Sequence, residues 1–225
     1  MTTSRQRSSS VQRNGGDAAK DVPVSERRQA ILAIAAEIFA RKGFATTTVR
    51  EIADEAGILS GSLYHHFDSK ETMVDEVLSG FLHDMVQGYE HIVESVDDPL
   101  EALEELVRFA FRALLPHRAA LKVAQNESHR LQQFDRFAYL GAGYARVEEL
   151  WTSVLRRGIE SGVFRDDLDT KLVYLFMRDA IWVTVRWYQP DGRYTLDEMA
   201  NSYLVFALEG LYTGNDRQRR GTKSA

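Results

Sequence analysis

The stretch that decides the fold is residues 47–71, TTVREIADEAGILSGSLYHHFDSKE. Thr48 and Glu51 have the spacing of a capping box, in which each side chain accepts a hydrogen bond from the backbone N–H of the other residue. This pattern predicts that a helix begins at residue 48. Gly57 is placed to end it after about two turns, because glycine readily adopts the backbone conformation that closes a helix.

A second short helix follows at once. We expect Ile58 and Leu59 to fill the turn and Ser60 to cap the helix, while Leu63 and Phe67, four residues apart, bury together. Two short helices joined by a tight turn are typical of a helix-turn-helix, whose second helix enters the major groove of DNA.

The side chains left outside by Leu63 and Phe67 would form a reading surface for DNA, made of Ser60, Gly61, Ser62, Tyr64 and His65. Glycine in a helix costs about 1 kcal/mol relative to alanine, so Gly61 suits a backbone that approaches DNA closely. Residues around the first helix, and a lysine that opens the next one, are placed to meet phosphates. The candidate DNA-binding residues are therefore Thr46, Thr47, Arg50, Ser60, Gly61, Ser62, Tyr64, His65 and Lys70.

The rest of the ordered chain is also predicted to be helical. Apolar residues recur at intervals of three and four, prolines number four, and no β-like alternation persists, so the fold class is all-α. The expected helices run from Ser25 to Gly43, from Lys70 toward Val96, onward from Asp98-Pro99 and from Pro116, and over about 135–162, 167–188 and 195–213.

The sequence divides into a helix-turn-helix domain and a larger domain between two tails. Both tails lack apolar periodicity, and the first is rich in Ser, Arg and Gly, so we expect them to be disordered. The net charge of −5 is unevenly spread: residues 1–70 carry +2 and residues 71–225 carry −7, so only the first part suits a polyanion. The predicted parts are a tail 1–24, a DNA-binding domain 25–70, a ligand-binding and dimerisation domain 71–213 and a tail 214–225.

Several classes of protein are excluded by what the sequence lacks. With no cysteine it has no disulfide, catalytic thiolate or cysteine-bound metal, and no apolar run is long enough to span a membrane, so we expect a cytoplasmic protein. No nucleophile elbow, phosphate loop or metal-ligand cluster is present, and His65 and His66 would point about 100° apart on a helix. We therefore expect neither an enzyme nor a bound metal or cofactor.

The helix-turn-helix motif resembles the signature of the TetR family of transcriptional regulators. The likeness covers about 45 residues and rests on four runs: Thr47 to Ala53, Ala56 to Ile58, Gly61 to Phe67 and Ser69 to Glu71. It implies a homodimer that binds palindromic operator DNA, with a divergent ligand domain behind. The last two helices would form a shared four-helix bundle, for which an apolar face is offered by Tyr203, Leu204, Phe206, Ala207 and Leu211.

The effector must be sought in the C-terminal part, where two arginines interrupt an apolar run. Arg178, Trp182 and Arg186 are four residues apart, so they share one helical face along about 12 Å. A guanidinium in apolar surroundings needs a partner. Either protein carboxylates supply it, with Glu148, Glu149 and Asp169 as candidates and Asp179 on a different face, or an anionic ligand does.

An anionic ligand held by two arginines and a tryptophan would suit a coenzyme A thioester, whose phosphates and planar base match those side chains. A closer resemblance, to TetR-type repressors of the later, ring-degrading stage of cholesterol catabolism, implies a CoA thioester of a steroid fragment as effector. It also implies Arg178, Trp182 and Arg186 as ligand-binding residues. The alternative is a fatty acyl or other hydrophobic effector. We expect the effector to tilt the helix that begins at Lys70 and so change the spacing of the two DNA-binding domains.

Overall fold

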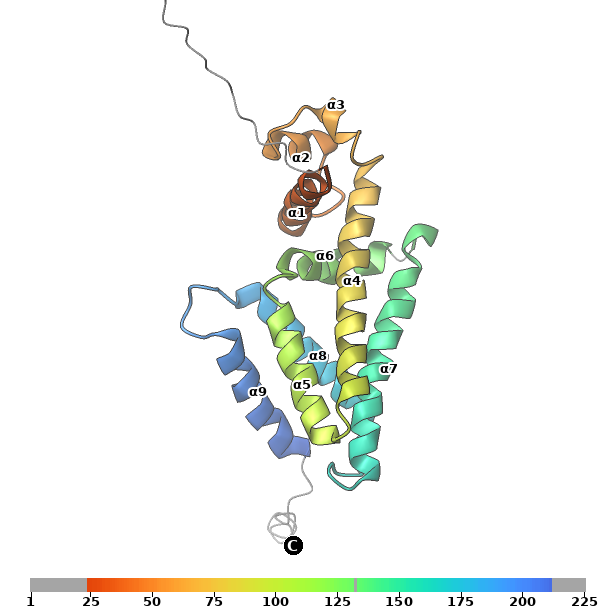
Figure 1. Cartoon of the computed structure of the whole chain (residues 1–225), viewed down its shortest axis with the longest axis vertical. Helices are drawn as coiled ribbons and strands as arrows, with labels where there is room; N and C mark the ends of the chain where they lie inside the picture. The colour runs from red at the N-terminus through yellow and green to blue at the C-terminus, as the bar shows by residue number, and fades with distance from the viewer. Residues whose placement is uncertain (1–23, 132, 212–225) are drawn as a thin grey trace, which may run out of the picture.

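The computed structural model describes residues 24–131 and 133–211 (Figure 1). These residues form nine α-helices and one 3-10 helix and contain no strand, which confirms the all-α prediction. The predicted tails lie outside them, except that Val24 already belongs to the first helix. The helices are α1 (Val24–Lys42), α2 (Val49–Glu55), α3 (Ser60–Leu63), α4 (Lys70–Ser95), α5 (Pro99–Ala113), α6 (Arg118–Leu131), η1 (Asp135–Phe137), α7 (Tyr139–Glu160), α8 (Thr170–Trp187) and α9 (Leu196–Leu211).

Local sequence signals set the boundaries of the first helices. Gly43 ends α1 and Gly57 follows α2, with φ angles of +87° and +65° that L-residues with side chains rarely adopt. The capping box of Thr48 and Glu51 is present, as predicted. The carboxylate of Glu51 accepts hydrogen bonds from Lys42 and from Thr48, and these bonds lower the pKa of Glu51 to about 2.

The later helices begin where polar caps or proline allow. Ser69 caps α4, Asp98 caps α5 ahead of Pro99, and Asp169 caps α8, each side chain accepting a backbone N–H of the first turn. The helix expected from Pro116 starts two residues later, at Arg118. The helix expected from about residue 135 is divided into the single turn η1 and α7.

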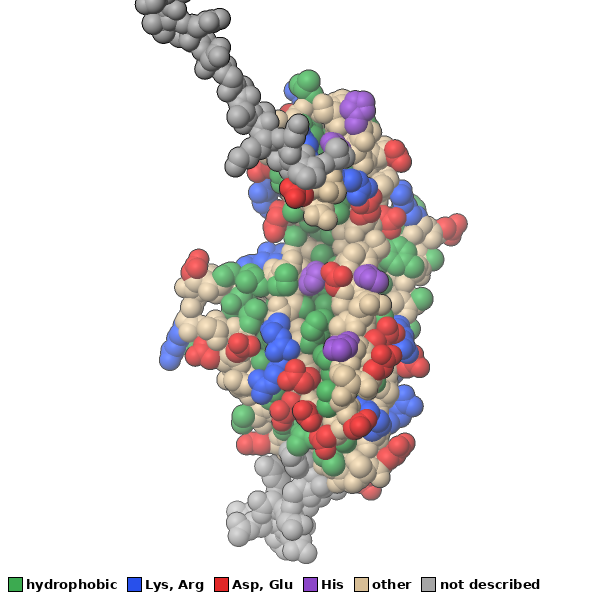
Figure 2. All heavy atoms as spheres, in the orientation of Figure 1, with side chains coloured by type: hydrophobic (Ala, Val, Ile, Leu, Met, Phe, Trp, Pro, Cys, Tyr) green, Lys and Arg blue, Asp and Glu red, His purple; other side chains and the backbone are tan. Residues whose placement is uncertain are grey.

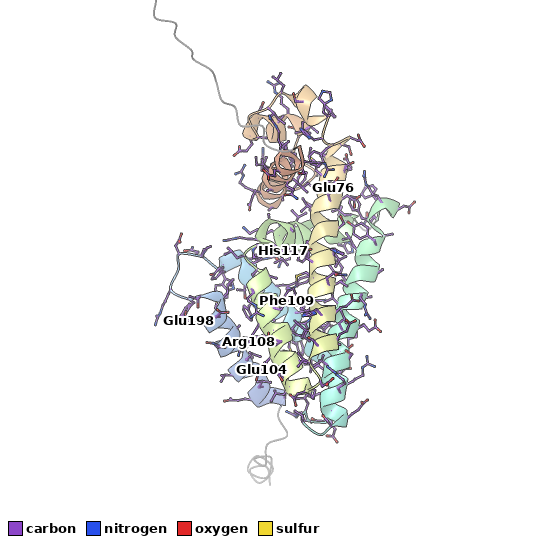
Figure 3. All side chains as sticks on the ribbon, viewed as in Figure 1. Glu76, Glu104, Arg108, Phe109, His117 and Glu198 are labelled. Atoms are coloured by element: carbon purple, nitrogen blue, oxygen red, sulfur yellow. The ribbon has the colours of Figure 1, made fainter. Side chains whose placement is uncertain are left out.

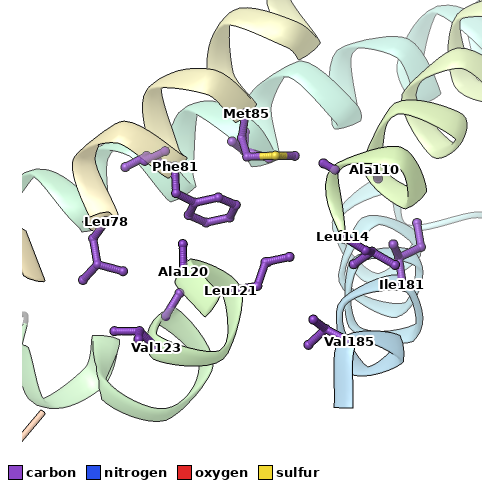
Figure 4. Packing of buried hydrophobic residues seen from close by; sticks show 14 of the residues in the cluster. Leu78, Phe81, Met85, Ala110, Leu114, Ala120, Leu121, Val123, Ile181 and Val185 are labelled. Atoms are coloured by element: carbon purple, nitrogen blue, oxygen red, sulfur yellow. The ribbon is translucent and has the colours of Figure 1, made fainter. Parts of the chain in front are cut away.

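The helices α1–α3 form a small bundle at one end of the molecule, and the long helix α4 runs from it through the larger C-terminal part (Figure 1). There α4 packs against α5 and α7, while α6 contacts α1, α4 and α8. The buried core between these helices includes Phe81 and Met85 of α4, Leu114 after α5, Leu121 of α6 and Ile181 of α8 (Figure 4). Helix α6 is therefore packed between the N-terminal bundle and the C-terminal helices.

Helix α9 packs on α5 at the side of the molecule and lies apart from the other helices in Figure 1. Within the described ranges, no helix combines the length and the apolarity that crossing a bilayer requires. Figure 2 shows acidic and basic side chains interspersed over the C-terminal part.

Candidate nucleic-acid interface and ligand site

The candidate reading surface lies at the end of the molecule formed by α2 and α3 (Figure 1). Helix α3 has four residues and continues as turns, in which the amide of Phe67 donates to the carbonyl of Leu63 at 3.0 Å. Leu63 and Phe67 are buried, as predicted, and Tyr64 and His65 are exposed. Residues 60–67, the recognition segment below, thus present one apolar side to the core and one side to solvent.

Small residues make the outer side of α3 accessible. Gly61 is exposed, and a Cβ atom there would meet no other atom within 4 Å, so the packing of the described residues does not require a glycine. Ser60 and Ser62 are half-buried. Arg50 of α2 is exposed and has a loose contact with Asp54 at 3.8 Å. Their role in DNA binding stays a prediction that this geometry permits.

The prediction for the turn itself is wrong in two respects. Leu59 does not fill the turn but is 80% exposed, and Leu59 rather than Ser60 is the N-cap residue of α3, without a side-chain hydrogen bond. Ile58 alone packs against the core. The cause is the extended backbone at Leu59, with φ −69° and ψ 143°, because adjacent side chains of an extended chain point to opposite sides.

Two predicted DNA contacts are used inside the domain instead. Thr47 is buried, and its hydroxyl donates to the carbonyl of Gly43 at 2.8 Å. The ammonium of Lys70 donates to the carbonyls of Phe44 and Thr47, each at 3.0 Å, and lies 4.6 Å from the centre of the Phe44 ring. The carbonyls after α1 lack helical partners, which is why these donors turn inward. Thr46 is exposed, although its hydroxyl donates to the backbone carbonyl of Lys42.

Arg28 is a residue that sequence reasoning missed. Its guanidinium makes two hydrogen bonds of 2.6 Å to the carboxylate of Glu76, donates to the carbonyl of His66 at 3.3 Å, and lies 4.4 Å from the centre of the Phe67 ring. It therefore joins α1, the recognition segment and α4, where Figure 3 labels Glu76. Because Glu76 lies 48 residues along the chain, no local pattern signals the pair.

The three predicted ligand-binding residues come together in one open hollow of about 350 Å³ on α8. The hollow, called the ligand hollow below, is lined by Gln125, Arg178, Asp179, Trp182, Val183 and Arg186. It places two guanidinium groups beside an indole ring, as the helical spacing predicted.

Arg178 already has a carboxylate partner in the hollow. Two of its nitrogens lie 2.8 Å from Asp179, and its guanidinium lies 5.5 Å and 5.8 Å from the ring centres of Tyr174 and Trp182. Burial acts to lower the pKa of Arg178, but the hydrogen bond to Asp179 and the nearby tyrosine raise it above the ordinary value. The expectation that Asp179 faces elsewhere is wrong, because the long arginine side chain turns back to its neighbour.

Gln125 of α6 is the second residue that sequence reasoning missed. Its amide accepts a hydrogen bond from Arg186 at 3.1 Å and donates one to the carbonyl of Trp182 at 2.8 Å, so it joins α6 to α8. Beneath the hollow, a cavity of only about 10 Å³ is lined by Tyr89, Ala110, Val147, Trp151, Tyr174, Arg178, Ile181 and Trp182. Arg178 and Trp182 thus separate the hollow from the core in this conformation.

The apolar face expected for dimerisation is only partly where the sequence placed it. Phe206 is 78% exposed, but Leu204 and Leu211 are buried within the chain, because α9 turns that side toward α5. Phe176 and Trp187 of α8 are exposed as well. Between α8 and α9 run two grooves of about 510 Å³ and 320 Å³, which share Ala180 and Tyr203.

Comparisons with known proteins give consistent results. The model for bacterial regulatory proteins of the tetR family matches residues 31–77, and that for the tetracyclin repressor-like C-terminal domain matches residues 96–211. The HTH-type transcriptional repressor KstR2 of Mycobacterium tuberculosis is 48% identical over 188 residues, which cover 84% of this chain and 94% of that protein. KstR2 of Rhodococcus jostii is 49% identical over 187 residues, which cover 83% and 92%.

A solved structure is also similar. The ketosteroid transcriptional regulator KstR2 of Mycobacterium tuberculosis matches with a TM-score of 0.82 and 47% identity, over 85% of this chain and 98% of that one.

Proposed function

This chain belongs to the TetR family of bacterial regulatory proteins and is a transcriptional repressor rather than an enzyme, and we propose that its effector is a CoA thioester of a steroid fragment. Binding of this effector would release a dimer from operator DNA in the cytoplasm and so induce genes for steroid-ring catabolism. The observation that carries the proposal is the ligand hollow, in which Arg178, Arg186 and Trp182 converge. The name of the similar solved protein, a ketosteroid regulator, supports the steroid part.

The hollow has the donors that a CoA thioester needs. A guanidinium binds phosphate through two parallel hydrogen bonds, and an indole ring stacks on a flat base such as adenine. A phosphate would take over Arg178 from Asp179, and another would take over Arg186 from Gln125. Since both present partners are weak competitors at a partly exposed site, a di- or triphosphorylated ligand would displace them.

The acyl part needs an apolar surface, and α8 supplies one beside the hollow. Val183 lines the hollow, and Trp187, one turn further on, lines the groove of about 320 Å³ between α8 and α9. The remaining apolar lining of that groove includes Phe111, Ala180 and Met199. We place the steroid fragment there, against the exposed apolar face that a second protomer would cover.

Calorimetric titration with four probes tests the effector class. We expect a steroid-ring CoA thioester to bind most tightly, free CoA and palmitoyl-CoA more weakly, and the free steroid acid least, because only the first combines the phosphates that the arginines bind with the rigid ring system that we place in the groove. Preference for palmitoyl-CoA would favour a fatty acyl effector. Tight binding of the free acid with no gain from CoA would contradict the role of the arginines.

Helix α6 is the connection between this hollow and the DNA-binding helices. Gln125 holds Arg186 and the carbonyl of Trp182, and two residues further along α6 the carboxylate of Glu127 accepts a hydrogen bond from the amide of Phe44 at 3.1 Å. The carbonyl of Phe44 in turn accepts from Lys70, the first residue of α4. We propose that the bond between Arg186 and Gln125 breaks when the ligand binds Arg186, and that α6 then shifts. Through Glu127, this shift would move the start of α4.

A comparison of two variants at Glu127 tests this connection separately from ligand binding. Glu127→Ala removes the acceptor, whereas Glu127→Gln keeps an oxygen for the Phe44 amide; Glu94→Ala, an exposed change on α4, serves as control. We expect only Glu127→Ala to reduce the effect of ligand on operator affinity, with ligand affinity unchanged in all three. Equal coupling in Glu127→Ala and wild type would contradict the route through α6, even if the effector is correct.

A further inference from the structure

Leu59 is 80% exposed, more than any other exposed large hydrophobic side chain in the described ranges. Within α1–α3 and their connections, that group contains only one other residue, Tyr64 at 55%. The remaining large hydrophobic side chains described in this bundle pack inward or are half-buried, whereas Leu59 directly precedes the recognition segment and Tyr64 lies within it. The exposed apolar surface of the N-terminal bundle is thus concentrated at the surface where DNA would bind.

The position of Leu59 also carries a cost that four of the other helices avoid. Helices α2, α4, α5 and α8 are capped by Thr48, Ser69, Asp98 and Asp169, whose side chains accept backbone N–H groups. Leu59 holds the same position on α3 and cannot accept such a bond. A polar cap stabilises a helix, so folding alone would favour serine or aspartate here.

From these observations we infer that Leu59 determines DNA specificity by packing against the C5-methyl group of a thymine in the major groove of the operator. Thymine is the one base that presents a methyl group in that groove, and aliphatic side chains recognise it by contact. Residues at the N-terminal end of a recognition helix are those that reach base edges. The three residues after Leu59 are two serines and a glycine, so Leu59 extends beyond them toward the bases.

The contact adds a kind of recognition that the polar reading surface lacks. Hydroxyl groups of Ser60, Ser62 and Tyr64 can exchange hydrogen bonds with several bases or with phosphates. A leucine beside a methyl group excludes water and discriminates thymine from cytosine at the same position. Leu59 is therefore assigned to the specificity of DNA recognition and not to its salt-dependent strength.

Removal of the methyl group from the DNA tests the inference directly. The full chain selects its inverted-repeat duplex from a random-sequence library, and each symmetric thymine pair of that duplex is then replaced by deoxyuridine, which lacks only the methyl. At one of these thymine pairs, replacement should lower the affinity of wild type by about 5-fold per half-site, the size expected for one buried methyl contact. Leu59→Ala should bind the methylated and unmethylated duplexes equally.

Two results would overturn the inference. One is a wild-type protein that binds every deoxyuridine duplex as tightly as the parent, and the other is a Leu59→Ala protein that keeps the wild-type loss. Leu59→Ser separates recognition from folding, because serine can cap α3. We expect Leu59→Ser to keep or raise the melting temperature while it loses the thymine preference.

Discussion

The reading surface and the ligand hollow differ in whether their polar side chains already have hydrogen-bond partners within the protein. On the reading surface, no side-chain hydrogen bond joins Tyr64 or His65 to another residue of the part described, and Gly61 faces open space. In the hollow each arginine is already engaged, Arg178 by Asp179 and Arg186 by Gln125. DNA would thus meet groups ready to bind, whereas an effector must first displace protein partners.

This difference suits a repressor that is bound to DNA until a ligand arrives. A pre-organised surface binds without rearrangement, so operator binding needs no signal. The arginines of the ligand hollow are paired with protein groups, so a bound ligand must change those contacts. Only a change of contacts on binding can be transmitted to another site. If the proposed function holds, the engaged arginines are the residues through which ligand binding would change the conformation.

The largest expected effect comes from removing both arginines of the ligand hollow. Arg178→Ala with Arg186→Ala should weaken binding of a steroid-ring CoA thioester by about 1000-fold, because each arginine contributes charge-assisted hydrogen bonds of about 1.5–3 kcal/mol. Operator affinity measured without ligand should fall far less, by under about 10-fold, because the double change breaks the bond of Arg186 to Gln125 but puts no ligand in the hollow. Calorimetry and fluorescence anisotropy measure the two affinities, and Arg193→Ala, an exposed change outside the hollow, is the control. Equal losses in both would show that the regions are not separable.

A change at Arg28 should weaken operator binding without affecting the ligand hollow. Arg28→Ala removes the connection of α1 and α4 to the recognition segment, and we expect operator affinity to fall about 10-fold, since partly exposed bidentate pairs contribute about 1–2 kcal/mol. Ligand affinity should not change. The neighbouring Arg27→Ala, exposed on α1, is the matched control. An equal loss in Arg27→Ala would assign the effect to general phosphate attraction instead.

A smaller effect distinguishes structural from DNA-binding cations within the N-terminal bundle. Lys70→Met removes the donor to Phe44 and Thr47, so it should lower the melting temperature by a few degrees, corresponding to about 1 kcal/mol. The salt dependence of operator binding should keep its slope, because Lys70 faces inward. A slope reduced by about one unit would restore Lys70 as a phosphate contact.

The smallest effect concerns pH and the junction before α6, where Figure 3 labels His117. Burial lowers the pKa of His117, opposed by the charge of Asp84, whose carboxylate lies 3.7 Å away. The unfolded chain therefore binds the proton more readily, so this residue stabilises the fold above pH about 6.5 and the stabilisation is lost as pH falls through the lowered pKa. Melting temperatures of wild type should fall more than those of His117→Asn between pH 7.5 and 5.5. Parallel pH dependences would contradict the assignment.

The features that the sequence could predict are those set by residues close together in the chain. The cap at Thr48, the ends of α1 and α2, and the burial of Leu63 and Phe67 depend on residues within a few positions of each other, so local patterns predicted them. The shared face of Arg178, Trp182 and Arg186 is likewise a property of one helix.

What the sequence missed depends on contacts between elements distant in the chain. Gln125 reaches the hollow from α6, and Arg28 finds Glu76 across 48 residues. The inward turn of Lys70 follows from unpaired carbonyls more than 20 residues earlier, which no helical spacing reveals. The exposure of Leu59 follows from the extended backbone of the single residue before α3, which no periodic pattern in the sequence signals.

The most direct measurement of the central claim is the affinity of a steroid-ring CoA thioester for the protein alone and for the protein saturated with operator DNA. Coupling of two sites is reciprocal, so the ligand must bind the operator complex more weakly, by the same factor by which it weakens operator binding. We predict matching factors of at least about 10. Equal ligand affinity with and without operator would contradict the account.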